Sequence, residues 1–379
     1  MRATLLCQRR KFLAGSLLAA SCNALGASPP MQSLSHEAAA RGNPEGKGIH
    51  ELNPPEMILP ILQNMQMRAI KAPPHGSPQF QQKQLTLLHF ADIHNDVNNL
   101  RRVMDFARRY RSYLTDILLT GDIAGGNWNS WSDDMMTVPD FPGVLKTLGN
   151  HDIYKWNRTA RNATSSECYG KYFVGIESWG VTQPNGNNPS RLCYWHKDYS
   201  ACGIRLIGLD CMHYDDAQHL WFVGVLKGAR SKGLAVIVAQ HYPPAEDKDC
   251  TGLPNCPFDS LQRESMCDSS PRAVTAVDSF QKSGGEFVCW LCGHTHTDFC
   301  GTVNGKRQLF MTVGTARNFE HWCDSRRVTG EKSQDLFNVI SIDTYQKHVR
   351  VFRVGAEWSR YLQHRVTMCI DYAALRQVS

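Results

Sequence analysis

From residue 85 onward, short apolar runs alternate with stretches whose apolar residues recur at helical spacing. The run 85–91 is almost continuously apolar, which is typical of a strand covered on both faces. The next stretch is expected to be a helix capped by Asn98 or Asn99, and its apolar stripe consists of Leu100, Val103, Met104 and Ala107. This alternation predicts an α/β fold.

The same pattern predicts the remaining elements. Strands are expected at 116–120, 144–148, 234–239 and 287–291, in a hairpin at 191–199 and 204–209, and near 308–313, 336–342 and 349–354. Helices are expected at 217–229 and from Ser270 to Gly284. Residues 153–190 are polar and rich in turn residues, like insertions that line a pocket.

The first 27 residues have the pattern of an export signal, with a basic stretch, an apolar run at 12–20 and then small residues. Arg9-Arg10 followed by Phe12-Leu13 resembles a bacterial twin-arginine signal, which predicts an exported, periplasmic protein. An alternative is a lipoprotein signal with a lipid anchor at Cys22. The apolar run is shorter than the ~20 residues that span a bilayer, and no other stretch predicts a transmembrane helix.

The chain therefore divides into four expected parts. After the signal at 1–27, residues 28–84 are rich in Pro, Gln, Ser and Gly, which indicates a tether with a short docking segment between Met57 and Met67. Residues 85–355 form the expected folded domain, and residues 356–379 are a C-terminal extension. The sequence does not indicate an oligomeric state.

The charge of the chain bears on its partners. The net charge is +6, and without the four basic residues of the leader it falls to +2. A protein that grips nucleic acid by its phosphates is expected to have a clustered basic surface. Specific nucleic-acid binding is therefore not expected.

The chain has fourteen cysteines, and an even number in an exported protein permits disulfides. Local bridging is plausible in the polar loop that holds Cys250, Cys256 and Cys267. Cys289 and Cys292 lie in an apolar run and are expected in the core, since they lack the second half of a zinc site. The sequence does not give the pairing.

Five short motifs rich in histidine and carboxylate residues follow one another along the chain. They are Asp92-Ile93-His94, Gly121-Asp122, Gly149-Asn150-His151-Asp152, His241 and Gly293-His294-Thr295-His296. Four of them directly follow an apolar run, and open α/β sheets build their sites at the carboxyl ends of strands. Oxygen and imidazole ligands without cysteine suit Mn, Fe or Zn, so the set indicates a two-metal hydrolase.

The spacing within the motifs also fits metal binding. Asp92 and His94 are two residues apart, as are His294 and His296, and in extended backbone such side chains leave on the same side. The two oxygens of Asp122 allow this carboxylate to bridge two cations. The amide of Asn150 is a neutral ligand, which limits the negative charge that a phosphate meets.

The order of these motifs resembles the calcineurin-like metallophosphoesterases, whose pattern is Asp-x-His, Gly-Asp, Gly-Asn-His-Asp/Glu, His and Gly-His-x-His. The resemblance covers roughly residues 85–354, and every metal-ligand position is filled. It implies a four-layer α/β/β/α sandwich of two mixed β-sheets flanked by helices. It also implies two metal ions, one held by Asp92, His94, Asp122 and His296 and the other by Asp122, Asn150, His241 and His294.

The resemblance further implies a phosphoric ester hydrolase that attacks small-molecule phosphomonoesters or phosphodiesters with a hydroxide activated by the two metals. His151 matches the family's catalytic histidine, which stabilises developing charge or protonates the leaving oxygen, and Asp152 would orient it. The segment 123–126 lacks the polar residues that many relatives carry after the bridging aspartate, so the local substrate contacts stay open.

Other residues near the motifs have two interpretations each. Trp128 and Trp131 could stack on an aryl group or a nucleobase, or could pack within their loop. Arg317 could reach a phosphate oxygen or face solvent. The alternative to an enzyme is a non-catalytic surface protein that binds phosphate or a partner through the metals, although such a protein has no need of His151 and Asp152. Because only residues 356–379 follow the last predicted strands, the large C-terminal domain of periplasmic 5′-nucleotidases is not expected.

Overall fold

The computed structural model describes residues 47–70, 84–126, 128, 133–155, 162–184, 192–244, 250–252, 269–303, 305–317, 327–356 and 367–378. Residues 46–379 form one compact unit. The export signal, its candidate anchor Cys22, Trp131 and the proposed bridging cysteines Cys256 and Cys267 lie outside the described residues, as does most of the tether.

The first β-sheet has seven strands in the order β14-β13-β12-β11-β1-β2-β3. Its parallel part consists of β1 (Leu85–Phe90), β2 (Asp116–Thr120) and β3 (Leu145–Thr147). Its antiparallel part consists of β11 (Leu336–Asp343), β12 (His348–Gly355), β13 (Thr367–Asp371) and β14 (Arg376–Val378). The two parts meet at β1, where Leu87 pairs with Ile340 on one side and with Asp116 on the other.

The second sheet also has seven strands, in the order β4-β5-β6-β8-β10-β9-β7. Its centre is parallel and consists of β5 (Ile204–Gly208), β6 (Ala235–Ala239), β8 (Phe287–Cys292) and β10 (Leu309–Thr312). Its edges are antiparallel and consist of β4 (Trp195–Tyr199), β9 (Phe299–Val303) and β7 (Cys250–Gly252). Both sheets are therefore mixed, as predicted.

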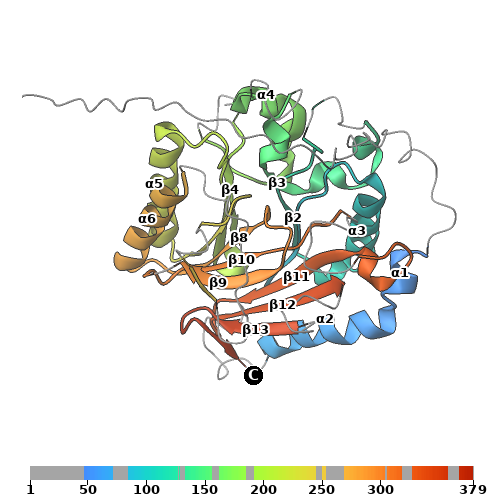
Figure 1. Ribbon diagram of the computed structural model, residues 1–379. Coiled ribbons are helices and arrows are strands. Elements are labelled where there is room, and N and C mark those ends of the chain that lie inside the picture. Colours follow the sequence, from blue (N-terminus) through green and yellow to red (C-terminus); the bar gives the residue numbers. More distant parts are fainter. Residues whose placement is uncertain are drawn as a thin grey trace, which may run out of the picture. The chain divides into compact units, whose positions relative to one another are not determined.

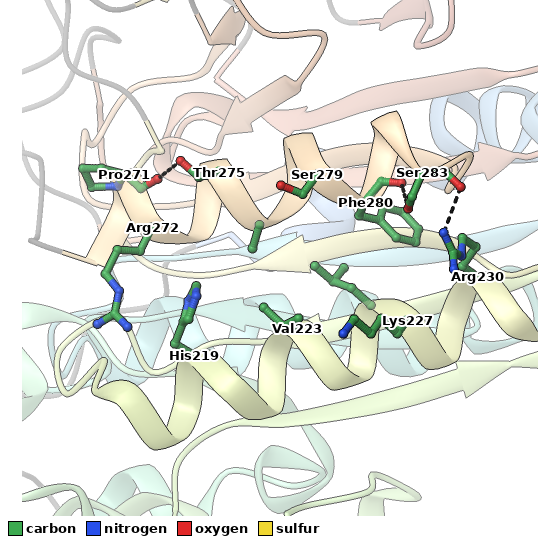
Figure 2. Close-up of a pocket in the computed structure, with 12 residues that line it drawn as sticks. His219, Val223, Lys227, Arg230, Pro271, Arg272, Thr275, Ser279, Phe280 and Ser283 are labelled. Carbon is green, nitrogen blue, oxygen red and sulfur yellow. Dashed lines mark hydrogen bonds between the residues drawn. The ribbon is translucent and has the colours of Figure 1, made fainter.

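Helices cover the outer faces of both sheets (Figure 1). On the second sheet, α5 (Asp216–Ser231) and α6 (Ser269–Lys282) lie side by side, and a groove of about 570 Å³ runs between them, with Val223 and Lys227 on one wall and Ser279 and Phe280 on the other (Figure 2). On the first sheet, α3 (Val97–Arg109) packs Phe106 against Phe337 of β11. The remaining helices are α2 (Pro55–Ile70) and the short α1 (Ile49–Leu52) and α4 (Ser165–Cys168).

The side chains of β6 show why the sheets stack in this way. Ala235, Ile237 and Ala239 face the core shared by the two sheets, whereas Val236 and Val238 face the core under α5 and α6. A strand that is apolar at every position must be covered on both faces, because successive side chains point in opposite directions. The result is the predicted α/β/β/α sandwich.

Several local features differ from the sequence prediction. The cap of α3 is Asp96, whose carboxylate accepts the backbone N–H of Asn99, so the assignment to Asn98 or Asn99 was wrong. The strands β7, β9, β13 and β14 were not predicted. The expected docking segment lies within α2, where Ile58, Leu62 and Met65 are buried.

The described cysteines whose side chains are placed are free thiols. Cys289 and Cys292 are buried, as expected for core residues. Among the described residues, no helix has the length and apolar character required to cross a bilayer.

Candidate metal centre

All five motifs lie just beyond the carboxyl ends of strands. Asp92 and His94 follow β1, Asp122 follows β2, and the turn of Asn150, His151 and Asp152 follows β3. In the second sheet, His241 follows β6, and His294 and His296 follow β8. Because these strands are parallel within each sheet, their carboxyl ends share one edge, and the motifs gather there.

The backbone of this edge differs from the prediction. Asp92 and His94 have φ of 55° and 46°, so they are left-handed rather than extended. Asp122, His294 and His296 also have positive φ. Asp, Asn and His tolerate this region better than most residues, yet such backbone costs on the order of 1–3 kcal/mol per residue and persists only where the surroundings enforce it.

Hydrogen bonds between the turns hold these residues in the left-handed conformation. The backbone N–H of Asp92 donates to Gly121 O (3.1 Å), and that of His94 donates to Asp122 O (3.0 Å). The carboxylate of Asp92 accepts the N–H of His294 (3.0 Å). The carboxylate of Asp122 accepts the N–H of His151 (2.8 Å). Each carboxylate therefore ties two strand ends together.

Gly149 allows the closest approach in this region. A Cβ atom at this position would lie 2.2 Å from Oδ1 of Asp122, well inside contact distance. The residue before the Asn-His-Asp turn must therefore be glycine if the turn is to lie against the Asp122 carboxylate.

The first group of candidate ligands is Asp92, His94, Asp122 and His296, whose ligand atoms all lie within 4.8 Å of one another. Nε2 of His296 lies 3.3 Å from Oδ1 of Asp92, and Nε2 of His94 lies 3.7 Å from Oδ2 of Asp122. The Nε2 atoms of His94 and His296 are 3.2 Å apart. Two imidazole nitrogens at this distance need a proton or a cation between them.

The second group is Asp122, His241 and His294. Nε2 of His241 lies 3.3 Å from Oδ2 of Asp122 and 3.1 Å from Oδ1 of Asn150, so the amide oxygen of Asn150 joins this group. Nε2 of His294 is buried and has no hydrogen-bond partner within the described part of the chain. A buried nitrogen without a hydrogen-bond partner is unfavourable, and a metal ion bound to it would remove that cost.

The two groups share Asp122, which is the arrangement expected of a bridging carboxylate. Four imidazoles, a carboxylate and an amide oxygen around one shared carboxylate make a donor set for borderline divalent or trivalent metals. The residues present therefore fit a dinuclear metal site. His294, His296, Asn150 and His151 are only partly buried, so this side of the group is open to a substrate.

Two backbone carbonyls orient the histidines. Nδ1 of His241 lies 2.7 Å from Thr120 O, and Nδ1 of His94 lies 3.3 Å from Ala124 O. A ring that donates from Nδ1 presents Nε2 as the free ligand atom. Both contacts come from β2 and the loop after it.

Tyr242 is a residue that the sequence analysis did not single out. Its ring packs against His294, with centroids 4.3 Å apart, and meets His241 edge to face at 5.6 Å. It therefore supports both histidines of the second group. Its position directly after His241 was the available signal.

Burial and the neighbouring carboxylates have opposite effects on the pKa values of these histidines. Desolvation lowers the pKa of His94 and of His294 to about 3, so both rings are neutral at neutral pH, as metal ligation requires. Burial also acts on His241, but the neighbouring Asp122 outweighs it and raises the pKa to about 9. For Asp122, burial would raise the pKa, whereas His241 and His151 hold it well below its usual range.

His151 lies beside the first group, and its side chain is partly exposed. Its ring meets His94 edge to face at 4.6 Å, and its Nε2 lies 3.9 Å from Oδ2 of Asp122. Nδ1 lies over Gly126, where a Cβ atom would come within 2.6 Å. This nitrogen has no hydrogen-bond partner among the described residues. His151 therefore faces the shared carboxylate without belonging to either ligand group.

The carboxylate of Asp152 does not contact His151, which differs from the predicted orienting role. Its two oxygens accept the backbone N–H groups of Ala124 and of Gly149, each at 2.8 Å. Burial and the charge of Asp122 raise the pKa of Asp152 to about 7. Asp152 instead joins the loop after β2 to the turn after β3.

Two of the candidate substrate contacts, Trp128 and Arg317, lie near this centre. Trp128 donates from Nε1 to Asp152 O (2.7 Å), which favours the loop-packing interpretation. The backbone N–H of Arg317 donates to Asp92 O (3.3 Å), and the side chain of Arg317 is partly exposed. Trp131 is outside the described residues.

The geometry agrees with comparisons to known proteins. Residues 85–298, more than half of the chain, match the family model for the calcineurin-like phosphoesterase domain. No curated protein sequence matches the chain. A dimetal phosphatase from Danio rerio superimposes with a TM-score of 0.53 at 13% identity, covering 76% of this chain and 99% of that chain. This likeness bears on the fold alone.

Two further structures match at lower TM-scores. A predicted phosphoesterase from Streptococcus pneumoniae has a TM-score of 0.28 at 14% identity and covers 72% of this chain and 90% of that chain. The anchor protein of the inner membrane complex of Plasmodium has a TM-score of 0.41 at 12% identity and covers 78% of this chain and 90% of that chain.

Proposed function

The chain belongs to the calcineurin-like phosphoesterase family, and we propose that it hydrolyses small-molecule phosphoric esters with two metal ions held at its strand ends. The observation that carries the proposal is that Asp122 belongs to both groups of candidate ligands. A carboxylate shared in this way supports two neighbouring cations rather than one. The metals are proposed to be Mn, Fe or Zn, given the oxygen and imidazole donors.

Asp92, His94, Asp122 and His296 would hold one ion, and Asp122, Asn150, His241 and His294 the other. When bound, such a pair supplies Lewis acidity to the phosphate oxygens and lowers the pKa of water. The residues of the chain orient the metal ligands and fix the loops that carry them. Thr120 and Ala124 orient the imidazoles through their carbonyl oxygens, and Asp152 fixes the two loops against each other.

His151 is proposed as the catalytic acid. It lies beside the candidate ligands, on the partly exposed side of the centre, with its Nε2 facing the shared carboxylate. A histidine at this position can donate a proton to the leaving oxygen of the ester or stabilise the charge that develops there. Arg317 is a proposed contact for a phosphate oxygen.

The leader at 1–27 supports an exported, periplasmic enzyme, and Cys22 would be its lipid anchor if the signal is of the lipoprotein type. Membrane fractionation of the wild type and of Cys22→Ala separates the two cases. An anchored protein moves to the soluble fraction when Cys22 is replaced, whereas a processed periplasmic protein is unaffected.

Hydrolysis of p-nitrophenyl phosphate and of bis(p-nitrophenyl) phosphate tests the proposal. The mature protein would be stripped with EDTA and reloaded with Mn, Zn or Fe. Metal-restored turnover is expected, and the ratio of the two rates assigns monoesterase or diesterase preference. Absence of turnover on either ester, with two metals bound per chain, would contradict the enzyme proposal and favour a phosphate-binding protein.

A further inference from the structure

A second histidine–carboxylate pair lies at the end of β5, outside the candidate metal centre. Asp210 is fully buried, and its Oδ2 lies 2.9 Å from Nδ1 of His213. The other ring nitrogen of His213, Nε2, lies 2.6 Å from the carbonyl oxygen of Ala163. The ring of His213 therefore spans two separate segments of the chain.

Both partners of this ring are acceptors. A carboxylate faces Nδ1 and a backbone carbonyl faces Nε2, so only a doubly protonated imidazolium donates to both. Either neutral tautomer leaves a nitrogen lone pair pointing at an oxygen. The contact therefore holds fully only while the ring carries its positive charge.

Asp210 is held rigidly in place for this role. Its Oδ1 accepts the backbone N–H groups of Met212 and His213, and its Oδ2 accepts the hydroxyl of Ser165 (3.0 Å). The side chain of Gln218 bonds both the N–H and the C=O of Asp210. The carboxylate thus has a fixed position from which to hold His213.

The segment around Ala163, which His213 contacts, is hydrogen-bonded to the turn that contains His151. The backbone N–H of Ala163 donates to Ile153 O (2.8 Å), and Asn162 pairs with Tyr154 in an antiparallel bridge. Ile153 belongs to the same short helical turn as His151. We call the pair of Asp210 and His213 the clamp. Through Ala163, the clamp holds the turn that carries the proposed catalytic acid.

We propose that His213, in its protonated form and paired with Asp210, is a positioning residue that holds the His151 turn in its active geometry. This inference rests on the proposed function for its catalytic consequence. The clamp itself is a property of the fold and can be tested without any substrate. No step of the reaction passes through His213.

The charges around His213 agree with a stable imidazolium. Burial lowers the pKa of the ring, but Asp210, the carbonyl of Ala163 and the more distant Asp215 outweigh it and raise the pKa above its ordinary value. Because the folded pKa is higher than the unfolded one, the stabilisation is complete below the unfolded pKa. It is lost as pH rises through the folded pKa.

The test combines a histidine NMR titration with amide hydrogen exchange of residues 162–168 in the full chain. The variants are His213→Gln, which keeps one donor, His213→Ala and Asp210→Asn. His219→Ala is the matched control. His219 lies on α5, and its Nδ1 is 3.1 Å from the hydroxyl oxygen of Tyr214, which is not part of the clamp.

In the wild type, the His213 resonance is expected to titrate above the ordinary histidine pKa, and the protection factors of 162–168 should fall over the same pH range. Asp210→Asn should move both transitions to lower pH. His213→Ala should remove the pH dependence of protection and lower kcat by about tenfold to a hundredfold with little change in KM, since a misplacement of ~1 Å costs up to ~10²-fold. His213→Gln should restore part of that loss.

Two outcomes measured without substrate would overturn the inference. One is a His213 that titrates at or below the ordinary histidine pKa, and the other is a protection of 162–168 that His213→Ala leaves unchanged. Both are independent of turnover, so they are distinguishable from a failure of the proposed hydrolysis. A folded His213→Ala protein with wild-type kcat would also exclude the positioning role.

Discussion

The Nε2 atoms of His94 and His296 lie 3.2 Å apart, although the two residues come from different sheets and are 202 positions apart in the chain. Such a close approach of two imidazole nitrogens is favourable only if a proton or a cation lies between them. The carboxylates of Asp92 and Asp122 lie within 4 Å of the same nitrogens, so a cation would be surrounded by matched donors. This contact places the centre between the sheets rather than on either one.

Asp122→Asn tests the shared carboxylate. The variant keeps an oxygen to accept the N–H of His151 but loses the negative charge that both groups share. We expect fewer than two metals per chain and a loss of turnover larger than the ~10–100-fold typical of residues that only support a ligand. Metal analysis beside the hydrolysis assay measures both. Asp105→Asn, at an exposed site on α3, is the control and should behave like the wild type.

His151→Asn separates catalysis from metal binding. Because His151 is not in either ligand group, the variant should retain its metals while kcat falls by about 10²–10⁴-fold, the usual contribution of a general acid. The loss should be smaller for p-nitrophenyl esters than for alkyl esters, whose leaving oxygens need a proton more. An unchanged rate for the alkyl ester would remove His151 from the mechanism.

Asp152→Asn distinguishes the observed role of Asp152 from the predicted one. An amide at this position puts an N–H₂ group against a backbone N–H, either of Ala124 or of Gly149, so one buried hydrogen bond is lost. The free energy of unfolding should fall by about 1–3 kcal/mol, as measured by urea denaturation. Lost activity at unchanged stability would instead support direct orientation of His151.

Lys146→Met should alter the pH dependence of stability. Lys146 is buried on β3 near the rings of Phe141 and Trp179, and burial lowers its pKa from 10.5 to about 7. Between these values the unfolded chain binds more protons, so this residue makes the wild type more stable as pH rises, by up to about 1.4 kcal/mol per pH unit.

The methionine variant should lack that slope in urea denaturation at pH 7, 8 and 9. Lys232→Met, at an exposed lysine after α5, is the matched control and should keep it. If the free energy of unfolding has the same pH dependence in the wild type and in Lys146→Met, Lys146 remains charged in the folded protein.

The strands that carry the motifs could be predicted because they are buried on both faces and therefore read as apolar runs. β6, with the sequence Ala235 to Ala239, is such a case. β13 and β14 could not, because their residues are mostly exposed or only partly buried at the edge of the first sheet and carry no clear pattern. The cap of α3 was missed because Asp96, Asn98 and Asn99 all suit that role.

The residues of the candidate centre could be predicted from their order, but their contacts could not. The positive φ of Asp92 and His94 depends on hydrogen bonds to the loop after β2, which no local pattern reveals. The same holds for Asp152, whose partners Ala124 and Gly149 contribute only their backbones. A sequence identifies the side chains of a site, but it does not show which backbone groups will bond to them.

A metal titration of the stripped protein, with turnover of p-nitrophenyl phosphate followed after each addition, tests the central claim most directly. The account predicts that turnover appears as metal is added and levels off at two ions per chain, and that Asp122→Asn fails to reach this plateau. Turnover that is complete without metal, or two bound ions with no turnover on either the monoester or the diester, would contradict it.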